Sequence, residues 1–126
     1  MKRKVKRVTK RDSICLFVLK GEFLRSVVED LVFDYTRKHF DNWEMFNEYH
    51  FGGYAKFSKD LISFINNFKA KYGIILDPVY TGKMMFGLYD LTGKGYFKTG
   101  SKIIAIHTGG LQGIRGFNTR FGNLIR

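Results

Sequence analysis

The sequence has 126 residues, which is the length of one domain or of part of a larger one. Hydrophobic residues make up 44% of it and aromatic residues 17%, which excludes a disordered chain because such chains lack large apolar side chains. No apolar run approaches the ~18 residues that a membrane-spanning helix needs, and residues 1–20 lack the pattern of a signal peptide. A single cysteine, Cys15, suits a reducing compartment, so we expect a cytoplasmic protein.

The net charge of +11 is concentrated at one end of the sequence. Residues 1–12 contain seven basic residues and one acidic residue, with little apolar content and no clear period. We expect this segment to be a flexible, solvated basic tail. Basic clusters also attract nucleic acid, so a small basic nucleic-acid-binding protein is an alternative. It is disfavoured because no aromatic residues that could stack on bases are interleaved there.

The first half of the remaining sequence alternates between strand and helix patterns. Residues 14–19 (ICLFVL) form a short apolar run that is typical of a buried strand. Apolar residues then recur at every third or fourth position and predict an amphipathic helix over residues 22–38. Residues 43–51 (WEMFNEYHF) are rich in aromatic residues and nearly alternating, which favours a second strand. Ser58 is a good N-cap for a second helix that ends at residue 72.

The second half continues this alternation. Residues 74–76 (IIL) predict a short strand that ends at Asp77, because Pro78 restricts the residue before it to extended geometry. A helix is expected over residues 83–92. The run KIIAIH at 102–107 has the clearest strand pattern in the chain and leads directly into a glycine loop. A last helix or turn, interrupted by glycines, closes the sequence.

This order predicts an α/β fold in which a mostly parallel sheet is flanked by helices. Ligands of such sheets bind at the carboxyl ends of the strands, where the loops at residues 53–54, 79–82 and 107–110 are expected here. Tyr54 and Tyr80 lie in two of these glycine-flanked loops rather than on a core stripe. Either tyrosine could therefore stack on a flat ligand or handle a proton.

Other residues point to chemistry less clearly. Lys83 could form a Schiff base, but a solvated lysine in the first turn of a helix is the favoured interpretation. The turn at 108–110 could bring backbone N–H groups close to an anion or a ring, yet such turns are more often only structural. The three histidines lack metal-ligand spacing with any carboxylate or with Cys15, so no metal site is predicted.

Three runs of the sequence together resemble one enzyme family. They are FGGYAKFS at 51–58, LDPVYTGKMMFGLYDL at 76–91 and GSKIIAIHTGGLQG at 100–113. They are similar to the C-terminal part of the pyridoxal-phosphate-dependent family of 1-aminocyclopropane-1-carboxylate deaminase and D-cysteine desulfhydrase. The resemblance covers about residues 18–126 and implies a tryptophan synthase β-like fold, the fold type II of such enzymes. It implies that residues 13–126 are an incomplete C-terminal segment of the large domain.

The resemblance also implies roles for a few residues. Tyr80 matches the tyrosine that lies against the cofactor ring and faces the substrate, and Tyr54 matches a second active-site tyrosine whose hydroxyl approaches the substrate. Thr81 stands where deaminases have a glutamate that contacts the pyridine nitrogen. Thr108 matches a threonine near that nitrogen, and Gly109 belongs to the same loop. Tyr54 and Tyr80 are therefore expected to be catalytic, and Tyr80, Thr81, Thr108 and Gly109 to bind the cofactor.

The threonine at position 81 bears on the reaction. A carboxylate beside the pyridine nitrogen stabilises its protonated form and strengthens electron withdrawal, whereas a threonine offers only a hydrogen bond. Weaker withdrawal is adequate for β-elimination of a thiolate, but opening a cyclopropane ring asks for more. The resemblance therefore favours a D-cysteine desulfhydrase-like lyase, which releases pyruvate, ammonia and sulfide, over 1-aminocyclopropane-1-carboxylate deamination.

Parts of the family's site have no counterpart in this sequence. The Schiff-base lysine and the phosphate-binding loop of the family precede the region matched here. We therefore expect this chain alone neither to bind pyridoxal phosphate tightly nor to turn over an amino acid. Its partner would be a missing N-terminal half or a second copy, since an incomplete sheet leaves edges and apolar faces exposed. A non-catalytic remnant that only pairs with a partner chain is the other alternative.

Overall fold

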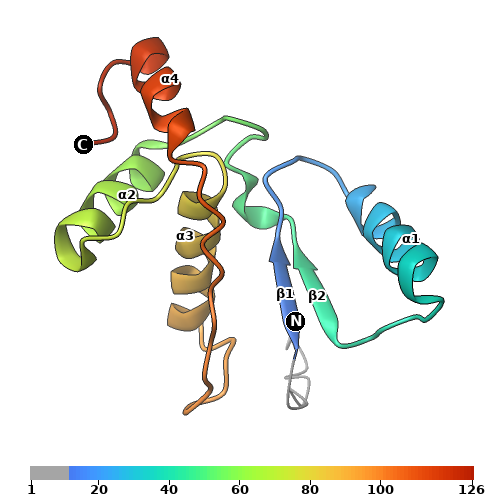
Figure 1. Cartoon of the computed structure of the whole chain (residues 1–126). Coiled ribbons are helices and arrows are strands. Elements are labelled where there is room, and N and C mark those ends of the chain that lie inside the picture. The colour runs from blue at the N-terminus through green and yellow to red at the C-terminus, as the bar shows by residue number, and fades with distance from the viewer. Residues whose placement is uncertain (1–11) are drawn as a thin grey trace.

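The computed structural model describes residues 12–126, so the predicted basic tail lies outside the described residues except for Asp12. The described chain contains two strands, four α-helices and one short 3-10 helix (Figure 1). In chain order these are β1 (Ser13–Leu16), α1 (Leu24–Thr36), β2 (Trp43–Phe46), η1 (Glu48–His50), α2 (Lys59–Tyr72), α3 (Thr81–Gly93) and α4 (Gln112–Phe121). None of the helices in this part of the chain is both long enough and apolar enough to cross a bilayer.

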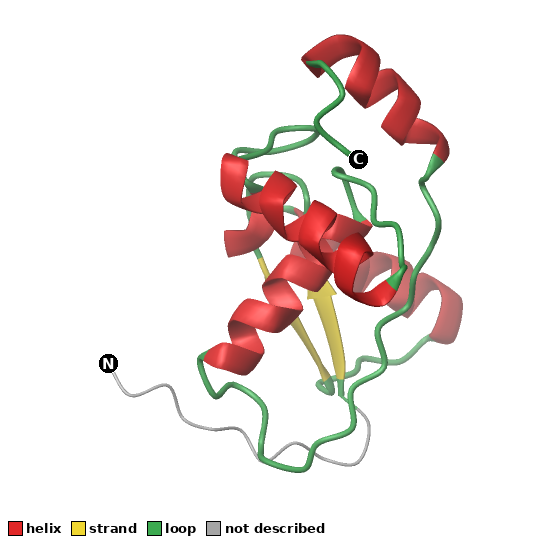
Figure 2. Cartoon of the chain, turned by 90° about the vertical axis from the view of Figure 1, so that its left-hand side faces the viewer, coloured by secondary structure: helices red, strands yellow, loops and turns green. Residues whose placement is uncertain are grey.

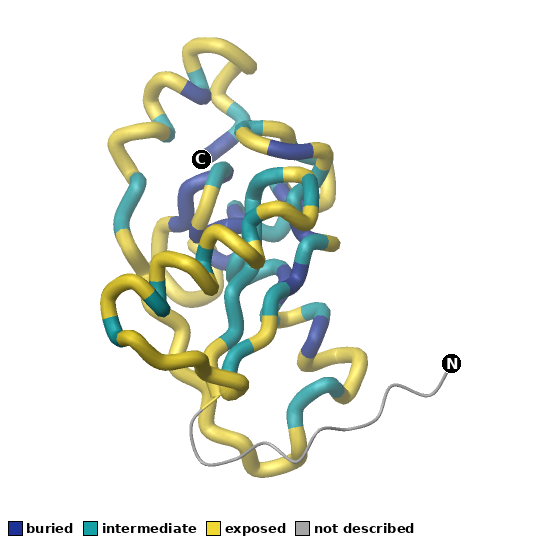
Figure 3. The backbone as a smooth tube through the Cα atoms, turned by 90° about the vertical axis from the view of Figure 1, so that its right-hand side faces the viewer, coloured by how far each residue is buried: buried dark blue, intermediate teal, exposed yellow. Residues whose placement is uncertain are grey.

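The two strands form a small parallel sheet. Ser13 pairs with Trp43 and Leu16 with Phe46, and α1 makes the connection between the strands (Figure 1). The predicted α/β class is thus confirmed as a small parallel sheet with four helices. The predicted helix over 22–38 forms, but α1 contains no buried residue (Figure 3). Its apolar residues Leu31 and Tyr35 are 64% and 93% exposed.

Two predicted strands do not form, which corrects the expectation of a larger sheet. Residues 74–76 and 102–107 have no strand pairing, and the second segment is part of a long loop that returns from α3 to α4 (Figure 2). A strand needs a neighbour to take up its backbone hydrogen bonds, and no described strand lies beside these segments. As a result Ile104 is 90% and Ile106 71% exposed.

The main core lies between α2, α3 and α4. Ser58 caps α2 by accepting a hydrogen bond from the N–H of Leu61 at 3.2 Å, and Gly73 ends the helix in the left-handed region, as predicted. The buried residues of this core come from α2, from the segment before α3 and from the C-terminal part of the chain: Leu61, Ile65, Phe68, Leu76, Phe117 and Ile125. This core fixes the start of α3 against α2.

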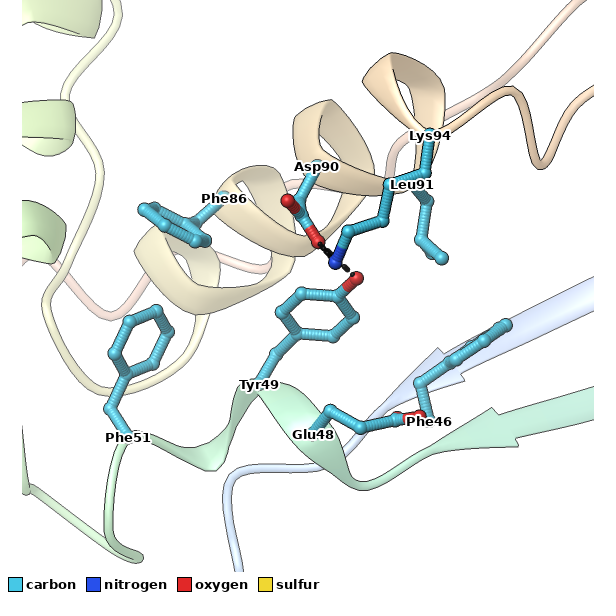
Figure 4. A pocket seen from close by; sticks show the side chains of 8 residues that line it. All are labelled: Phe46, Glu48, Tyr49, Phe51, Phe86, Asp90, Leu91 and Lys94. Carbon is cyan, nitrogen blue, oxygen red and sulfur yellow. Dashed lines mark hydrogen bonds and ion pairs between the residues drawn. The ribbon is translucent and has the colours of Figure 1, made fainter.

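The predicted strand over 43–51 ends early because Tyr49 turns toward α3. Its hydroxyl donates a hydrogen bond to the Asp90 carboxylate at 2.7 Å, and its ring packs where a side chain at Gly87 would stand (Figure 4). Phe46, Tyr49 and Leu91 form a second buried cluster there. The short 3-10 helix η1 therefore attaches the small sheet to α3 and directs the following turn toward the start of that helix.

Candidate functional site

The turn before α3 is organised around one buried carboxylate. Oδ1 of Asp77 accepts the backbone N–H groups of Val79 and Tyr80 at 2.8 and 2.7 Å. Oδ2 accepts the N–H of Thr81 at 2.8 Å and its hydroxyl at 2.6 Å. These N–H groups lie at the start of α3 and have no partner within the helix, so Asp77 caps the helix from four residues upstream of Thr81. The backbone of Tyr80 is fixed as a result.

Thr81, a predicted cofactor contact, is 2% exposed and belongs to this capping arrangement. Besides donating to Asp77, its hydroxyl oxygen accepts the N–H of Asp77 at 2.9 Å. A hydroxyl has one proton to donate, and that proton is used within the turn. Thr81 therefore reaches the surroundings of Tyr80 through the backbone, while its role toward a cofactor remains a prediction.

The structure brings the two predicted catalytic tyrosines together. The ring centroids of Tyr54 and Tyr80 are 6.1 Å apart with an interplanar angle of 64°, an edge-to-face arrangement. Both side chains remain about half-exposed. A hydrogen bond to Tyr54 raises the pKa of Tyr80, and partial burial and the nearby Asp77 carboxylate raise it further. Tyr80 therefore holds its proton to a higher pH than an ordinary tyrosine.

The glycine loop after residues 102–107 lies against the same turn. The Nε2 atom of His107 is 2.8 Å from the carbonyl oxygen of Ile75, and the N–H of Gly109 donates to Nδ1 of His107 at 3.1 Å. Gly110 has a φ of +83°, and a Cβ atom there would stand 3.1 Å from the Asp77 carboxylate. Thr108, in contrast, is exposed. The loop therefore places Gly110 beside Asp77, while the roles of Thr108 and Gly109 toward a cofactor remain predictions.

These segments enclose a pocket of about 350 Å³ at the starts of α3 and α4. Its lining residues are Tyr54, Asp77, Pro78, Val79, Tyr80, Gly110, Gln112 and Gly113. Of the predicted site residues, Tyr54 and Tyr80 line this pocket, while Thr81, Thr108 and Gly109 lie beside it. Asp77, Gly110 and Gln112 also line the pocket and were not predicted from the sequence, although an Asp-Pro pair directly before a helix indicates a capping carboxylate.

Lys83 corrects one prediction outright, because it is 1% exposed instead of solvated. Its ammonium group donates hydrogen bonds to the carbonyl oxygens of His50 at 2.8 Å and Gly53 at 2.9 Å. Burial lowers the pKa of Lys83 to about 8, and the Asp77 carboxylate opposes part of that shift. The lysine thus faces the turn that precedes Tyr54.

A second pocket, of about 340 Å³, lies between η1 and α3 (Figure 4). Three of its polar groups bind one another: Lys94 and Tyr49 both donate to the Asp90 carboxylate, and these bonds lower the pKa of Asp90. No group of three or more His, Cys, Asp or Glu side chains is placed to hold a metal ion anywhere in residues 12–126. Partial burial raises the pKa of the Cys15 thiol, which favours its uncharged form.

Part of this chain is similar in sequence to known 1-aminocyclopropane-1-carboxylate deaminases. A Pyrococcus horikoshii protein, named as a candidate 1-aminocyclopropane-1-carboxylate deaminase, is 42% identical over 62% of this chain and 23% of its own length. The 1-aminocyclopropane-1-carboxylate deaminase of Allorhizobium ampelinum is 42% identical over 52% of this chain and 19% of its own length. The predicted family resemblance is confirmed. No family model matches the chain.

A solved structure supports the resemblance to the deaminase family beyond the aligned sequence. A crystal structure described as an ACC deaminase homologue superimposes with a TM-score of 0.77 and 34% sequence identity. It covers 89% of this chain, and the matched part is 35% of the solved chain. The chain therefore spans about a fifth of the length of the curated deaminase relatives above and about a third of the structural relative.

The pocket fits one part of pyridoxal phosphate, the cofactor implied by the resemblance. Two tyrosine rings and glycine backbone suit a flat aromatic ring, because aromatic faces stack on it and glycine lets it approach closely. The lining residues include neither lysine nor arginine, the side chains that pair best with a phosphate. Among the described lining residues, the fit is therefore to the ring and its surroundings.

Proposed function

We propose that this chain forms the ring-binding wall of a pyridoxal-phosphate-dependent lyase or deaminase with a tryptophan synthase β-like fold. The observation that carries the proposal is the pairing of Tyr54 and Tyr80 at the pocket beside the Asp77 turn. When bound, the cofactor supplies a conjugated ring that withdraws electrons from the amino-acid carbon next to its nitrogen. The chain matches only part of the length of its relatives, so we propose that it acts as one part of the complete enzyme.

Each tyrosine has a separate task in this proposal. Tyr80, whose backbone is fixed by Asp77, offers its ring as the stacking surface. Tyr54 offers its hydroxyl to the substrate and can hold or move a proton there. The contact with Tyr54 raises the pKa of Tyr80, so Tyr80 keeps its proton to a higher pH than an ordinary tyrosine. Gly110 leaves the space beside Asp77 open.

We favour β-elimination from D-cysteine over cyclopropane ring opening. With one water, D-cysteine yields pyruvate, ammonia and sulfide. The reason is that the pocket offers no unengaged carboxylate among its described lining residues: Asp77 already accepts four hydrogen bonds, and position 81 is a threonine. A pyridine nitrogen beside these residues would be less strongly protonated, which weakens electron withdrawal.

The exposed apolar segment at 102–107 favours the proposal that this chain pairs with a partner polypeptide. Ile104 and Ile106 are largely exposed on an extended segment without a strand beside it. Single exposed apolar residues are ordinary, but an unpaired apolar strand is a template for pairing with another chain. We propose that a polypeptide corresponding to the remainder of the deaminase relatives covers this segment and supplies the phosphate-binding groups, and that the complex works in the cytoplasm.

A chimeric enzyme tests the proposed function. The segment of the Pyrococcus horikoshii relative that matches this chain is replaced by this chain's own residues, and sulfide release from D-cysteine is measured. We expect turnover that drops by about 10²-fold or more in Tyr54→Phe, because a positioned proton-transfer group contributes about that much. A folded chimera that binds the cofactor yet turns over neither D-cysteine nor 1-aminocyclopropane-1-carboxylate contradicts the proposal.

The substrate preference has its own test in the same chimera. Thr81→Glu adds a carboxylate, and Thr81→Gln is the matched control because it has nearly the same shape without the charge. We expect the ratio of ammonia release from 1-aminocyclopropane-1-carboxylate to sulfide release from D-cysteine to rise in Thr81→Glu alone. An equal ratio in both variants contradicts the argument from position 81.

A further inference from the structure

Lys83 connects the first turn of α3 to the turn that carries Tyr54. Its two acceptors are the carbonyl oxygens of His50 and Gly53, at 2.8 and 2.9 Å. These residues bound a tight turn, because the N–H of Gly53 itself donates to the His50 carbonyl at 3.1 Å. Gly53 has a φ of +124°, so the chain changes direction there, and Tyr54 follows directly. The lysine therefore binds both ends of the turn from which Tyr54 projects.

The contact between the Lys83 ammonium group and the two carbonyl oxygens is buried. An ammonium group that loses its water is stable inside a protein only where oxygen atoms replace that water. The two carbonyl oxygens do so, and desolvation still lowers the pKa of Lys83 to about 8. A neutral amine would retain two N–H donors, enough for both carbonyl groups. The connection therefore persists on either side of that pKa.

The same helix start also holds the other tyrosine. Tyr80 is fixed through Asp77, whose carboxylate also acts on Lys83 through its charge. Tyr54, on a segment some thirty residues earlier in the sequence, contacts Tyr80 through its ring edge.

The turn at 50–53 is also held to α3 by the ring contact of Phe51 with Phe86 and, one residue earlier, by the hydrogen bond from Tyr49 to Asp90. Among the described hydrogen bonds, those of Lys83 are the ones made to the backbone of the turn itself from α3.

We propose that Lys83 is a positioning residue, which holds the turn at residues 50–53 against α3 and thereby places Tyr54 opposite Tyr80. It acts through Tyr54 and touches neither substrate nor cofactor. The importance of that placement rests on the proposed function, but its test needs no cofactor. A failure of this inference is therefore distinct from a failure of the enzymatic proposal.

The test uses the full chain and the pKa of Tyr80 as the readout. Tyrosine labelled with ¹³C at Cζ is incorporated, the Tyr80 resonance is assigned with Tyr80→Phe, and its titration is followed by nuclear magnetic resonance. Tyr54→Phe sets the reference, since it removes the hydrogen bond that raises the Tyr80 pKa. We expect Lys83→Met to lower the Tyr80 pKa to the value in Tyr54→Phe.

Leu91→Ala is the matched control. Leu91 is buried on the same helix as Lys83 but belongs to the second buried cluster, with Phe46 and Tyr49. This substitution leaves a cavity in the core, which destabilises the chain, and keeps Lys83, Tyr54 and Tyr80. An unchanged Tyr80 pKa in Leu91→Ala, with a lowered one in Lys83→Met, supports the inference. A wild-type value in Lys83→Met, or an equal fall in both variants, overturns it.

A measurement on the unaltered chain decides the case in which Lys83→Met does not fold. Scalar couplings across hydrogen bonds are recorded from the Lys83 Nζ to carbonyl carbons, at a pH well below the Lys83 pKa. Couplings to the carbonyl carbons of both His50 and Gly53, with an Overhauser contact between the Tyr54 and Tyr80 rings, support the inference. Absence of either the couplings or the ring contact overturns it.

Discussion

The hydroxyl of Thr81 donates a hydrogen bond to the carboxylate of Asp77 at 2.6 Å, and both residues are 2% exposed. The same carboxylate accepts three successive backbone N–H groups. A buried carboxylate that accepts this many hydrogen bonds holds the chain around it in one conformation. The position of Tyr80 in the candidate site therefore depends on the hydrogen bonds that Asp77 accepts.

Asp77→Asn is expected to destabilise the chain. An amide has one oxygen, so it cannot accept from both sides of the turn, and its NH₂ group would face the donors of Thr81. Buried donors left without a partner cost about 1–3 kcal/mol each. Urea unfolding measures the loss, with Asp60→Asn as control because Asp60 is exposed in the first turn of α2. Equal unfolding midpoints for both variants would contradict this role of Asp77.

Two glycines of α3 are expected to respond in opposite ways to alanine. A Cβ atom at Gly82 would lie 2.6 Å from the Asp77 carbonyl oxygen and 2.6 Å from Ile65, whereas nothing lies within 4 Å of one at Gly93. Gly82→Ala should cost about 1–3 kcal/mol through overpacking. Gly93→Ala should stabilise by about 0.5–1 kcal/mol, because alanine favours the helix. Thermal unfolding measures both variants. Unfolding temperatures that shift in the same direction in both would contradict the tight packing at Gly82.

The depressed pKa of Lys83 predicts a pH dependence of stability. The folded chain releases this proton near pH 8, whereas the unfolded chain keeps it to about its ordinary value of 10.5. Between these values the unfolded state binds more protons, so the contribution of Lys83 to the free energy of unfolding rises with pH. The groups that act on Lys83 are the Asp77 carboxylate and the carbonyls of His50 and Gly53.

Subtraction of a variant isolates this effect. Both chains carry Tyr80→Phe, because Lys83→Met is itself expected to change the Tyr80 pKa. The difference in unfolding free energy between the chains with Lys83 and with Lys83→Met then removes the titration of the remaining tyrosines. We expect this difference to shift in favour of the chain with Lys83 as the pH rises from 8 toward 10. Parallel curves over that interval would show that the lysine is not desolvated in the folded chain.

The exposed apolar segment predicts how a partner is recognised. If residues 102–107 pair with a strand of a complementing polypeptide, Ile104→Lys should weaken that association, because it places a charge on the contact. Tyr35→Lys is the control, since Tyr35 is equally exposed but lies on α1. Size-exclusion chromatography with the rest of the Pyrococcus horikoshii relative measures the complex. Equal weakening by both substitutions would point to a general effect of exposed apolar surface.

Local signals made the helices predictable from the sequence. Ser58 and Gly73 mark both ends of α2, and the spacing of apolar residues between them gives its buried face. The glycine-flanked loops and the family resemblance each single out Tyr54 and Tyr80, but neither predicts that the two rings are in contact. Their distance depends on η1 and α3 packing together, which no local pattern encodes.

The failures of prediction have the same physical origin. Residues 102–107 carry a strong strand pattern, yet a strand forms only where a neighbour accepts its hydrogen bonds. Lys83 looks like a surface residue because lysine in a first helical turn usually is, and its burial depends on carbonyl groups some thirty positions away. Thr81 was considered for its side-chain chemistry toward a ligand, whereas the structure engages that side chain with Asp77.

Retention of pyridoxal phosphate tests the central proposal most directly. The isolated chain and the chimera with the Pyrococcus horikoshii relative are incubated with the cofactor and dialysed, and the visible absorbance that remains is recorded. The chimera should retain about one cofactor per chain and bind it about tenfold more weakly when Tyr80→Ala removes the stacking ring, whereas the isolated chain should retain none. A chimera that folds but retains no cofactor, or binds it equally tightly in Tyr80→Ala, would contradict the assignment of this pocket.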